Sequence, residues 1–150
     1  MIIRNNLRPC VIGVLAATVM TVGVATGGSG IAQAAAKSCA FEFTWTKPGV
    51  YPPQIIARGV AQCEVPPEEH ILTLALEYQN RGVWEVASAK EDRTLPPQAP
   101  NFASYQVSAT CYAGTWRASM SVTGTIQGRP FVFSDHTQSR EVPTSQCPSR

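Results

Sequence analysis

Charged residues and histidines are scarce in this sequence, and their scarcity narrows the functions open to it. Charged side chains make up 15% of the 150 residues, and the only histidines are His70 and His136. There is no run of Lys or Arg, no Gly-rich phosphate loop, no zinc-ligand spacing and no internal repeat. These absences argue against nucleic-acid binding, nucleotide chemistry and a zinc domain. We expect no metal and no cofactor.

A long hydrophobic run is also missing. The apolar run at residues 11–24 is shorter than the roughly 20 residues that a membrane-spanning helix needs. Two arginines precede it, and small residues followed by Ala-Gln-Ala at 32–34 come after it. This order is typical of a secretory signal peptide. We therefore predict a signal peptide over residues 1–34, cleavage after residue 34 or 36, and a secreted protein without a stable membrane anchor.

The charge balance changes when the predicted signal peptide is removed. Removal of 34 residues from 150 leaves 116, which is enough for one domain, residues 35–150. Two of the 12 basic residues are lost, and the remaining 10 balance the 10 acidic ones. The mature protein is then formally neutral, so we expect no charge-driven binding to nucleic acid or to anionic membranes.

Four cysteines remain in the mature chain, at Cys39, Cys63, Cys111 and Cys147. An even number in a small exported chain predicts a framework of two disulfides. Cys39 does not fit a lipid-anchor site, because it stands well beyond the apolar run and close behind the charged Lys37.

The pairing of the cysteines depends on how the first two strands fold together. A hairpin centred near Tyr51 would place Cys39 opposite Cys63, which leaves Cys111 to pair with Cys147. The competing arrangement joins Cys63 to Cys111 between the sheets, as in an immunoglobulin core, and Cys39 to Cys147. It gains from Trp84, which stands between the two cysteines as the core tryptophan of such a domain does. We favour the first arrangement.

Alternation of polar and apolar residues predicts seven strands, and no part of the mature chain shows a helical period. Proline pairs, glycines and the Asn-Arg-Gly sequence at 80–82 mark turns between them. Trp45 belongs to the apolar face of the first strand, and Trp84 and Val86 share a face of the fourth. We predict an all-β, immunoglobulin-like antiparallel sandwich with strands at residues 39–46, 54–63, 71–78, 83–89, 102–111, 116–126 and 131–141.

The order of glycine, cysteine and tryptophan resembles that of small exported two-disulfide β proteins of actinomycetes. The resemblance covers most of the mature chain and implies no known activity. It lies in Gly59-x-x-x-Cys63, Trp84, Cys111, Trp116-Arg117, Gly124 and Cys147. In size and cysteine number the chain is also similar to actinomycete subtilisin inhibitors and neocarzinostatin-type chromophore carriers. It lacks the cysteine-flanked reactive loop of the former and the closely spaced cysteine pair of the latter.

Few residues could support catalysis. Ser134, Asp135 and His136 are the residue types of a triad, but neighbours on a strand point to opposite faces. An acidic group at the ends of strands could attract calcium, yet it lacks the spacing of a calcium loop. That group comprises Glu64, Glu68, Glu69, His70, Glu91 and Asp92. We expect no catalytic residue and no metal site.

Turns that follow alternate strands lie at the same end of an antiparallel sandwich. This parity brings Tyr51, Arg81 and Tyr112 to one end, and Tyr and Arg are common anchors of interfaces. We predict a monomeric, exported binding module with a binding patch there and no catalytic site. Its partner would be an extracellular protein, a glycan or a small molecule. The alternatives are a secreted protease inhibitor that uses residues 92–100 and a small extracellular hydrolase.

Overall fold

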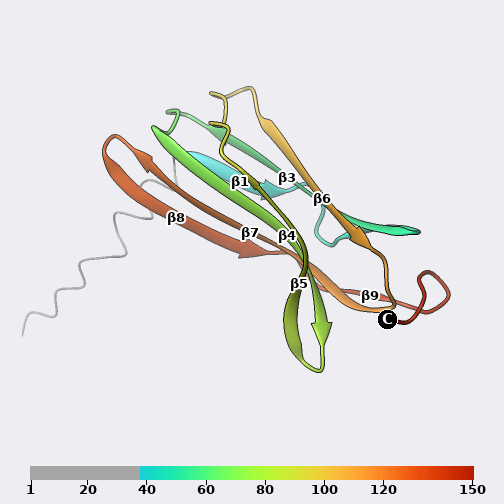
Figure 1. Cartoon of the computed structure of the whole chain (residues 1–150). Coiled ribbons are helices and arrows are strands. Elements are labelled where there is room, and N and C mark those ends of the chain that lie inside the picture. Colours follow the sequence, from blue (N-terminus) through green and yellow to red (C-terminus); the bar gives the residue numbers. More distant parts are fainter. Residues whose placement is uncertain (1–37) are drawn as a thin grey trace, which may run out of the picture.

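The computed structural model describes residues 38–150, which form nine strands and no helix (Figure 1). The predicted signal peptide lies outside this part of the chain. No helix long and apolar enough to span a membrane occurs between residues 38 and 150. The strands are β1 (Cys39–Phe43), β2 (Gly49–Tyr51), β3 (Gln54–Cys63), β4 (Glu69–Asn80), β5 (Val83–Asp92), β6 (Ala103–Thr110), β7 (Gly114–Ile126), β8 (Arg129–His136) and β9 (Arg140–Val142).

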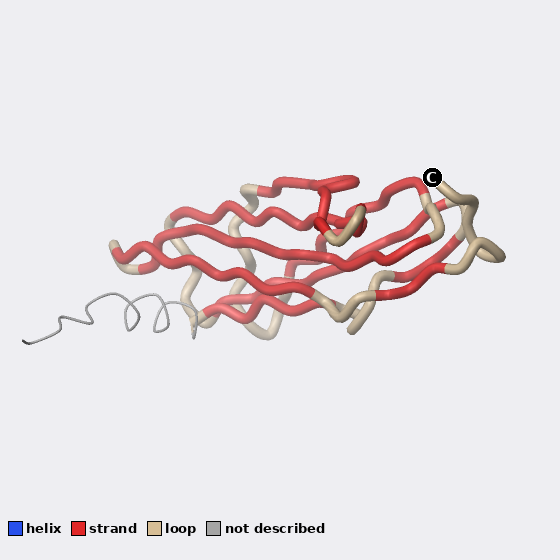
Figure 2. The backbone as a smooth tube through the Cα atoms, turned by 90° about the horizontal axis from the view of Figure 1, so that it is seen from below, coloured by secondary structure: helices blue, strands red, loops and turns tan. Residues whose placement is uncertain are grey.

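Two antiparallel sheets form a sandwich, as the sequence predicts. In the first sheet the central strand β3 pairs with β6 along one edge and with β1 and β2 along the other. The second sheet has the order β5–β4–β7–β8, and β9 continues the edge that β8 begins. The long strands run along the length of the molecule (Figure 2). Counting β1 with β2 and β8 with β9 gives the seven predicted strand positions.

One edge of each sheet is divided into two strands, which the alternation did not predict. Residues 49–51 were expected to lie in a loop because prolines and glycine surround them, but they pair with residues 54–56 of β3. Pro48 directly precedes this short strand, where its missing N–H group costs no ladder bond. At the other edge, Thr137 leaves the strand. Its hydroxyl accepts a hydrogen bond from the N–H of Ala118 at 2.9 Å and so separates β8 from β9.

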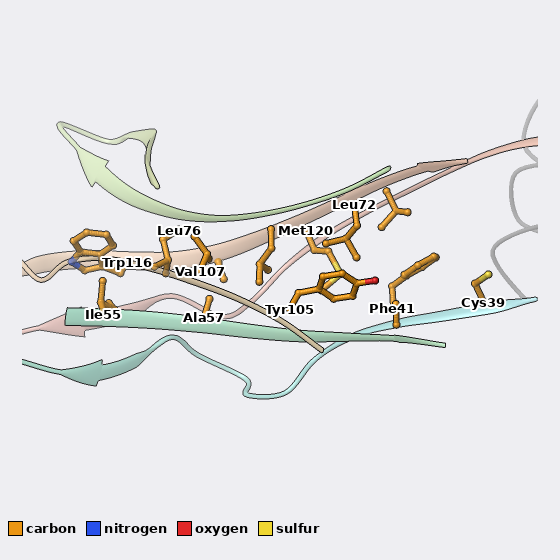
Figure 3. Packing of buried hydrophobic residues seen from close by; sticks show 14 of the residues in the cluster. Cys39, Phe41, Ile55, Ala57, Leu72, Leu76, Tyr105, Val107, Trp116 and Met120 are labelled. Atoms are coloured by element: carbon orange, nitrogen blue, oxygen red, sulfur yellow. The ribbon is translucent and has the colours of Figure 1, made fainter. Parts of the chain in front are cut away.

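Apolar side chains from both sheets fill the space between them (Figure 3). Trp116 of β7, 1% exposed, is the tryptophan of this core. Alternate residues of β4, β6 and β7 face inward and are buried, among them Leu72, Leu76 and Val107. Trp45, by contrast, lies outside the core, where it packs against the exposed Tyr51.

The register of the β4–β5 hairpin explains why Trp84 and Val86 lie outside the core. Asn80 pairs with Val83 across the turn, and the register shifts only beyond Val86, where Ala87 has no partner. Because side chains alternate with a period of two, the turn fixes the faces of Trp84 and Val86, which precede this bulge. Trp84 therefore pairs with Gln79 on the outer face, and Val86 is 62% exposed. The competing arrangement, in which Trp84 would be the core tryptophan of an immunoglobulin domain, is therefore not the observed one.

The disulfides join Cys39 to Cys63 and Cys111 to Cys147, which is the favoured pairing. Cys39 and Cys63 are direct cross-strand partners with Cα atoms 3.9 Å apart, closer than the usual range. The N–H of Cys111 donates to the carbonyl of Pro53 at 2.9 Å, so Cys111 lies beside the start of β3. Cys63 ends that strand, about 30 Å away at roughly 3.3 Å per residue. A disulfide between them is excluded.

The connections fall into two groups at opposite ends of the sandwich. We call the end with the β2–β3, β4–β5 and β6–β7 connections the turn end. The other, the crossover end, carries residues 64–68, the crossover segment 93–102 between the sheets, and the β7–β8 turn at residues 127–128. Both ends can be followed in Figure 1, where the β4–β5 hairpin projects at the turn end.

Candidate binding surfaces

Aromatic residues gather on the outer side of the β1/β2–β3–β6 sheet, on the surface that we call the aromatic face. It comprises Trp45, Tyr51, Arg58, Phe102 and Gln106. Tyr51 and Phe102 are 56% and 61% exposed, which is unusual for side chains of this size. The ring centroids of Trp45 and Tyr51 are 6.3 Å apart, at an interplanar angle of 43°.

Gly49 allows the two rings to lie against the strand. A Cβ atom at this position would lie 2.7 Å from Cε2 of Tyr51 and 3.0 Å from Cζ3 of Trp45. Any other residue would therefore push the rings outward. The glycine thus serves the packing of the aromatic face, and no turn requires it.

Arg58 joins the aromatic rings to the polar side chains of β6. Its guanidinium carbon lies 5.2 Å from the centroid of the Trp45 ring, a cation–π distance. Its Nε donates a hydrogen bond of 2.6 Å to Oε1 of Gln106. Both contacts hold a long side chain in one position, so the face offers a pre-organised guanidinium beside exposed rings.

Two hollows flank the ring of Phe102. The larger, about 400 Å³, is lined by Arg58, Val60, Phe102, Ser104 and Gln106, together with Thr44, Gly59 and Tyr105. The smaller, about 210 Å³, is lined by Ala40, Glu42, Val60, Gln62 and Phe102. Each hollow has an apolar floor at Val60 and Phe102 and hydrogen-bonding groups at its rim. The outer face of this sheet is therefore hollowed on both sides of the exposed Phe102 ring.

The three residues of the predicted patch, Tyr51, Arg81 and Tyr112, lie in different surroundings. The three turns share the turn end, as the parity of the strands requires. Tyr51 contributes to the aromatic face. Arg81 is exposed at the tip of the β4–β5 hairpin with a φ of 48°. The patch as a binding site stays a prediction.

Tyr112 lines a separate hollow of about 280 Å³ at the turn end, between β5 and β6. Tyr78 and Trp116 meet edge to face beneath it, with centroids 5.1 Å apart. Arg150 lies over the Tyr78 ring at 5.3 Å, and its Nη1 is 3.5 Å from Oε2 of Glu85. The Tyr78 hydroxyl donates to the carbonyl of Ala113 at 3.1 Å, so Tyr78 and Arg150 already have partners within the protein.

The acidic residues of the crossover end are dispersed. The carboxylate of Glu68 accepts hydrogen bonds from the N–H of Gly128 at 3.1 and 3.3 Å and so closes the β7–β8 turn. Glu91 pairs with Arg93. Between residues 38 and 150, no three His, Cys, Asp or Glu side chains converge as metal ligands would.

His70, which belongs to the acidic group considered above as a calcium site, is buried at the crossover end. It is 2% exposed, and neither ring nitrogen has a hydrogen-bond partner. Burial lowers its pKa below 6.5, although the Thr94 backbone and the charge of Asp92 act in the opposite direction. His70 does not line any of the three hollows described above, of about 400, 210 and 280 Å³.

Ser134, Asp135 and His136 do not form a triad. The carboxylate of Asp135 accepts from the backbone N–H of His136 at 2.8 Å. Nδ1 of His136 is 3.2 Å from the carbonyl of its own neighbour, Thr137. Ser134 pairs instead with Ser121 of β7, on the face opposite Asp135.

A polar cluster on the outer face of the second sheet was not predicted. Glu77 accepts from Nε of Arg117 and, at 3.0 Å, from the hydroxyl of Ser119. The Arg117 guanidinium lies 4.3 Å above the Trp84 ring. The pairing of Trp84 with Gln79 places Trp84 on this face, so the cluster depends on a hairpin register that alternation alone does not reveal.

Comparisons with known proteins identify no family. No protein-family model and no curated protein matches the chain. Among solved structures it is similar to β-glucosidase from Kluyveromyces marxianus, with a TM-score of 0.34 and 10% identity over 69% of this chain and 15% of that chain. The same enzyme in complex with glucose gives a TM-score of 0.36 and 9% identity, over 69% and 14%.

A protein from Archaeoglobus fulgidus gives a TM-score of 0.35 and 10% identity, over 71% of this chain and 95% of that chain. The chain spans only about 15% of the length of the β-glucosidase. All three TM-scores lie below 0.5, so these likenesses carry no argument about function. The function is inferred below from the chain's own surfaces.

Proposed function

We propose that this protein is an exported, disulfide-stabilised binding module whose aromatic face binds a neutral glycan chain. The observation that carries the proposal is the pair of exposed rings, Tyr51 and Phe102, on a rigid sheet with a fixed guanidinium between them. Two disulfides are typical of proteins from oxidising compartments, in agreement with export.

The chemistry of the face suits a sugar ring. A pyranose has an apolar C–H face that stacks on an aromatic ring, and hydroxyl groups around its edge that exchange hydrogen bonds. Phe102 and Val60 offer the apolar floor, while Arg58, Gln106 and Ser104 stand at the rim. Hydrogen-bonding side chains beside an exposed ring are the combination that a hydroxyl-rich ligand requires.

A peptide, a nucleic acid or a membrane fits this face less well. Both edges of β3 are paired, so an extended peptide finds no free backbone groups across the face. Arg58 lines the larger hollow and Glu42 the smaller, so their charges balance and the surface has no excess of positive charge for phosphate groups. A neutral glycan remains as the ligand class.

Retention on insoluble polysaccharides tests the proposal. The oxidised protein is incubated with cellulose, chitin and peptidoglycan, and the bound fraction is measured. We expect retention on at least one of them and at least a tenfold weaker affinity for Phe102→Ala and Tyr51→Ala, since exposed aromatic anchors dominate such contacts. Val132→Ala is the matched control, because Val132 is also 61% exposed but lies on β8 of the other sheet. Absence of retention on all three materials would contradict the proposal.

A further inference from the structure

The crossover segment holds an exposed tripeptide, Arg93–Leu95, between two fixed points. These residues lie outside any strand, and the side chain of Arg93 is 69% exposed. Leu95 is 46% exposed, whereas the next residue, Pro96, is fully buried. Leu95 and Pro96 each precede a proline, which restricts both to extended backbone conformations. The tripeptide is thus presented to solvent, and its C-terminal residue, Leu95, is restricted to an extended conformation.

A disulfide supports the C-terminal side of this tripeptide. The N–H of Cys63 donates to the carbonyl of Pro97 at 3.2 Å, and the N–H of Ala99 donates to the carbonyl of Cys63 at 3.1 Å. The side-chain amide of Gln98 donates to the carbonyl of Glu64 at 3.1 Å. Cys63 is itself joined to Cys39. The segment lacks cysteines in its own sequence, but the fold places one beside it.

The N-terminal side is held by Asp92, the last residue of β5. Its Oδ1 accepts a hydrogen bond of 2.8 Å from the backbone N–H of Thr94. This bond spans the Arg93–Thr94 peptide bond, so the groups on its two sides are tied to each other independently of that bond. The neighbouring ion pair of Arg93 with Glu91, at 2.8 Å, is exposed to solvent and therefore weak.

From this arrangement we propose a second activity, distinct from glycan binding: Arg93–Leu95 occupies the active site of a serine endoprotease that cleaves after arginine, and inhibits it. Such an enzyme binds its substrate in an extended form and accepts an arginine side chain in an acidic pocket. Arg93 would enter that pocket in place of its contact with Glu91. Affinity would follow from the rigidity of the segment, because little conformational entropy remains to be lost on binding.

The anchors also explain why the protein would inhibit and not be consumed. The protease serine oxygen attacks the carbonyl carbon of Arg93, the C–N bond to Thr94 breaks, and the proton of the serine passes to the Thr94 nitrogen. Asp92 keeps the new amine beside the ester. The amine then attacks the ester, restores the peptide bond and returns a proton to the serine. Positioning by Asp92 and Cys63 favours this reversal over hydrolysis by water.

Stoichiometric titration of trypsin with the oxidised full chain tests the inference. Residual hydrolysis of a small arginyl substrate is measured after preincubation. We expect activity to fall to near zero at about one equivalent, at least a 100-fold loss of potency for Arg93→Ala, and retention of potency within about tenfold for Arg93→Lys. Arg81→Ala removes an equally exposed arginine from a tight turn and is expected to change nothing. Equal melting temperatures of the variants ensure that potency and not folding is compared.

Asp92→Ala tests the step that restores the peptide bond separately from the binding of trypsin. We expect this variant to bind trypsin but to be cleaved at Arg93–Thr94 and released, so that inhibition becomes temporary. Full trypsin activity with a tenfold excess of the wild-type protein would overturn the inference. So would inhibition that survives Arg93→Ala, or rapid complete cleavage of the wild-type bond. None of these variants touches the aromatic face, so this result and that of the polysaccharide experiment are independent.

Discussion

His70 lies nearly parallel to Phe41, with ring centroids 5.9 Å apart and an interplanar angle of 17°. A neutral imidazole can occupy this place, but burial disfavours an imidazolium by more than the Thr94 backbone and the charge of Asp92 favour it. The protonation of one residue therefore bears on the stability of the whole crossover end.

We predict that acid destabilises the protein through His70. Burial lowers the pKa of the folded state below the ordinary value of 6.5, so the unfolded chain takes up a proton more readily. Stability is complete above about pH 6.5 and is lost as the pH falls from there towards the folded-state pKa. Thermal melting between pH 7.5 and 5 should show this, with about 4 °C lost per kcal/mol. His70→Phe should flatten the profile in this range, and an unchanged profile would contradict the assignment.

Tyr105 should lower the free energy of unfolding at alkaline pH, as His70 does at acid pH. Its buried hydroxyl has no partner and points towards Phe41 (Figure 3), and burial raises its pKa to about 12. Between pH 10 and 12 the unfolded chain loses this proton and the folded protein keeps it, so stability falls as the pH rises. We expect Tyr105→Phe to be more stable than the wild type by about 1 kcal/mol at pH 11, with a smaller difference at pH 8. Urea unfolding at both pH values measures it.

Removal of the disulfide between Cys111 and Cys147 should lower the free energy of unfolding by about 3–4 kcal/mol, the entropy expected for its loop. The two cysteines are separated by 36 residues, and both are buried. Urea unfolding of the Cys111→Ala/Cys147→Ala double variant gives the value. Retention on polysaccharide is expected to persist, since the aromatic face lies on other residues.

Two glycines should respond differently to alanine. A Cβ at Gly124 would meet the backbone carbonyl of Glu69 and lie 2.6 Å from the Phe131 ring, and neither can move without disturbing β4 or β8. We expect Gly124→Ala to cost 2 kcal/mol or more, at roughly the upper part of the overpacking range. Gly49→Ala meets only the ends of Trp45 and Tyr51. It should cost less than about 1 kcal/mol of stability while weakening glycan binding.

The signal peptide can be tested on exported material. We expect N-terminal sequencing to show a chain that begins at Ala35 or Lys37, because the Ala-Gln-Ala site precedes both. A protein that retains Met1 and sediments with membranes would contradict this prediction.

The disulfide pairing was predictable because most of β1 and β3 forms a regular ladder. The hairpin was centred at Tyr51, whereas the observed turn lies between Tyr51 and Gln54. Six positions separate Phe43 from Gly49 on one strand, but three separate Ile56 from Gly59 on the other. The surplus residues bulge out between β1 and β2 and bring Cys39 back opposite Cys63. The pair was thus correct although the assumed turn was not.

The surfaces were far less predictable than the strands. Alternation gives β3 its bounds and identifies the inner residues of β7, because burial imposes a period of two. It does not reveal that Arg58 meets Gln106, since this contact depends on the register of β3 with β6 across 48 residues. Nor does it show that residues 97–99 lie beside Cys63. The support for the exposed tripeptide comes from a strand that ends 30 residues earlier.

Cys63 takes part in several connections at once, and this has a consequence for how the molecule opens. It ends β3, carries the disulfide to Cys39, and binds the backbone of the crossover segment through Pro97 and Ala99. Local unfolding there cannot release one of these parts alone, so they form a single cooperative unit. The amide protons of Cys63 and Ala99 should therefore exchange with solvent at rates close to those of the sheet interior. The irregular crossover segment would then open no more often than the strands to which it is bound.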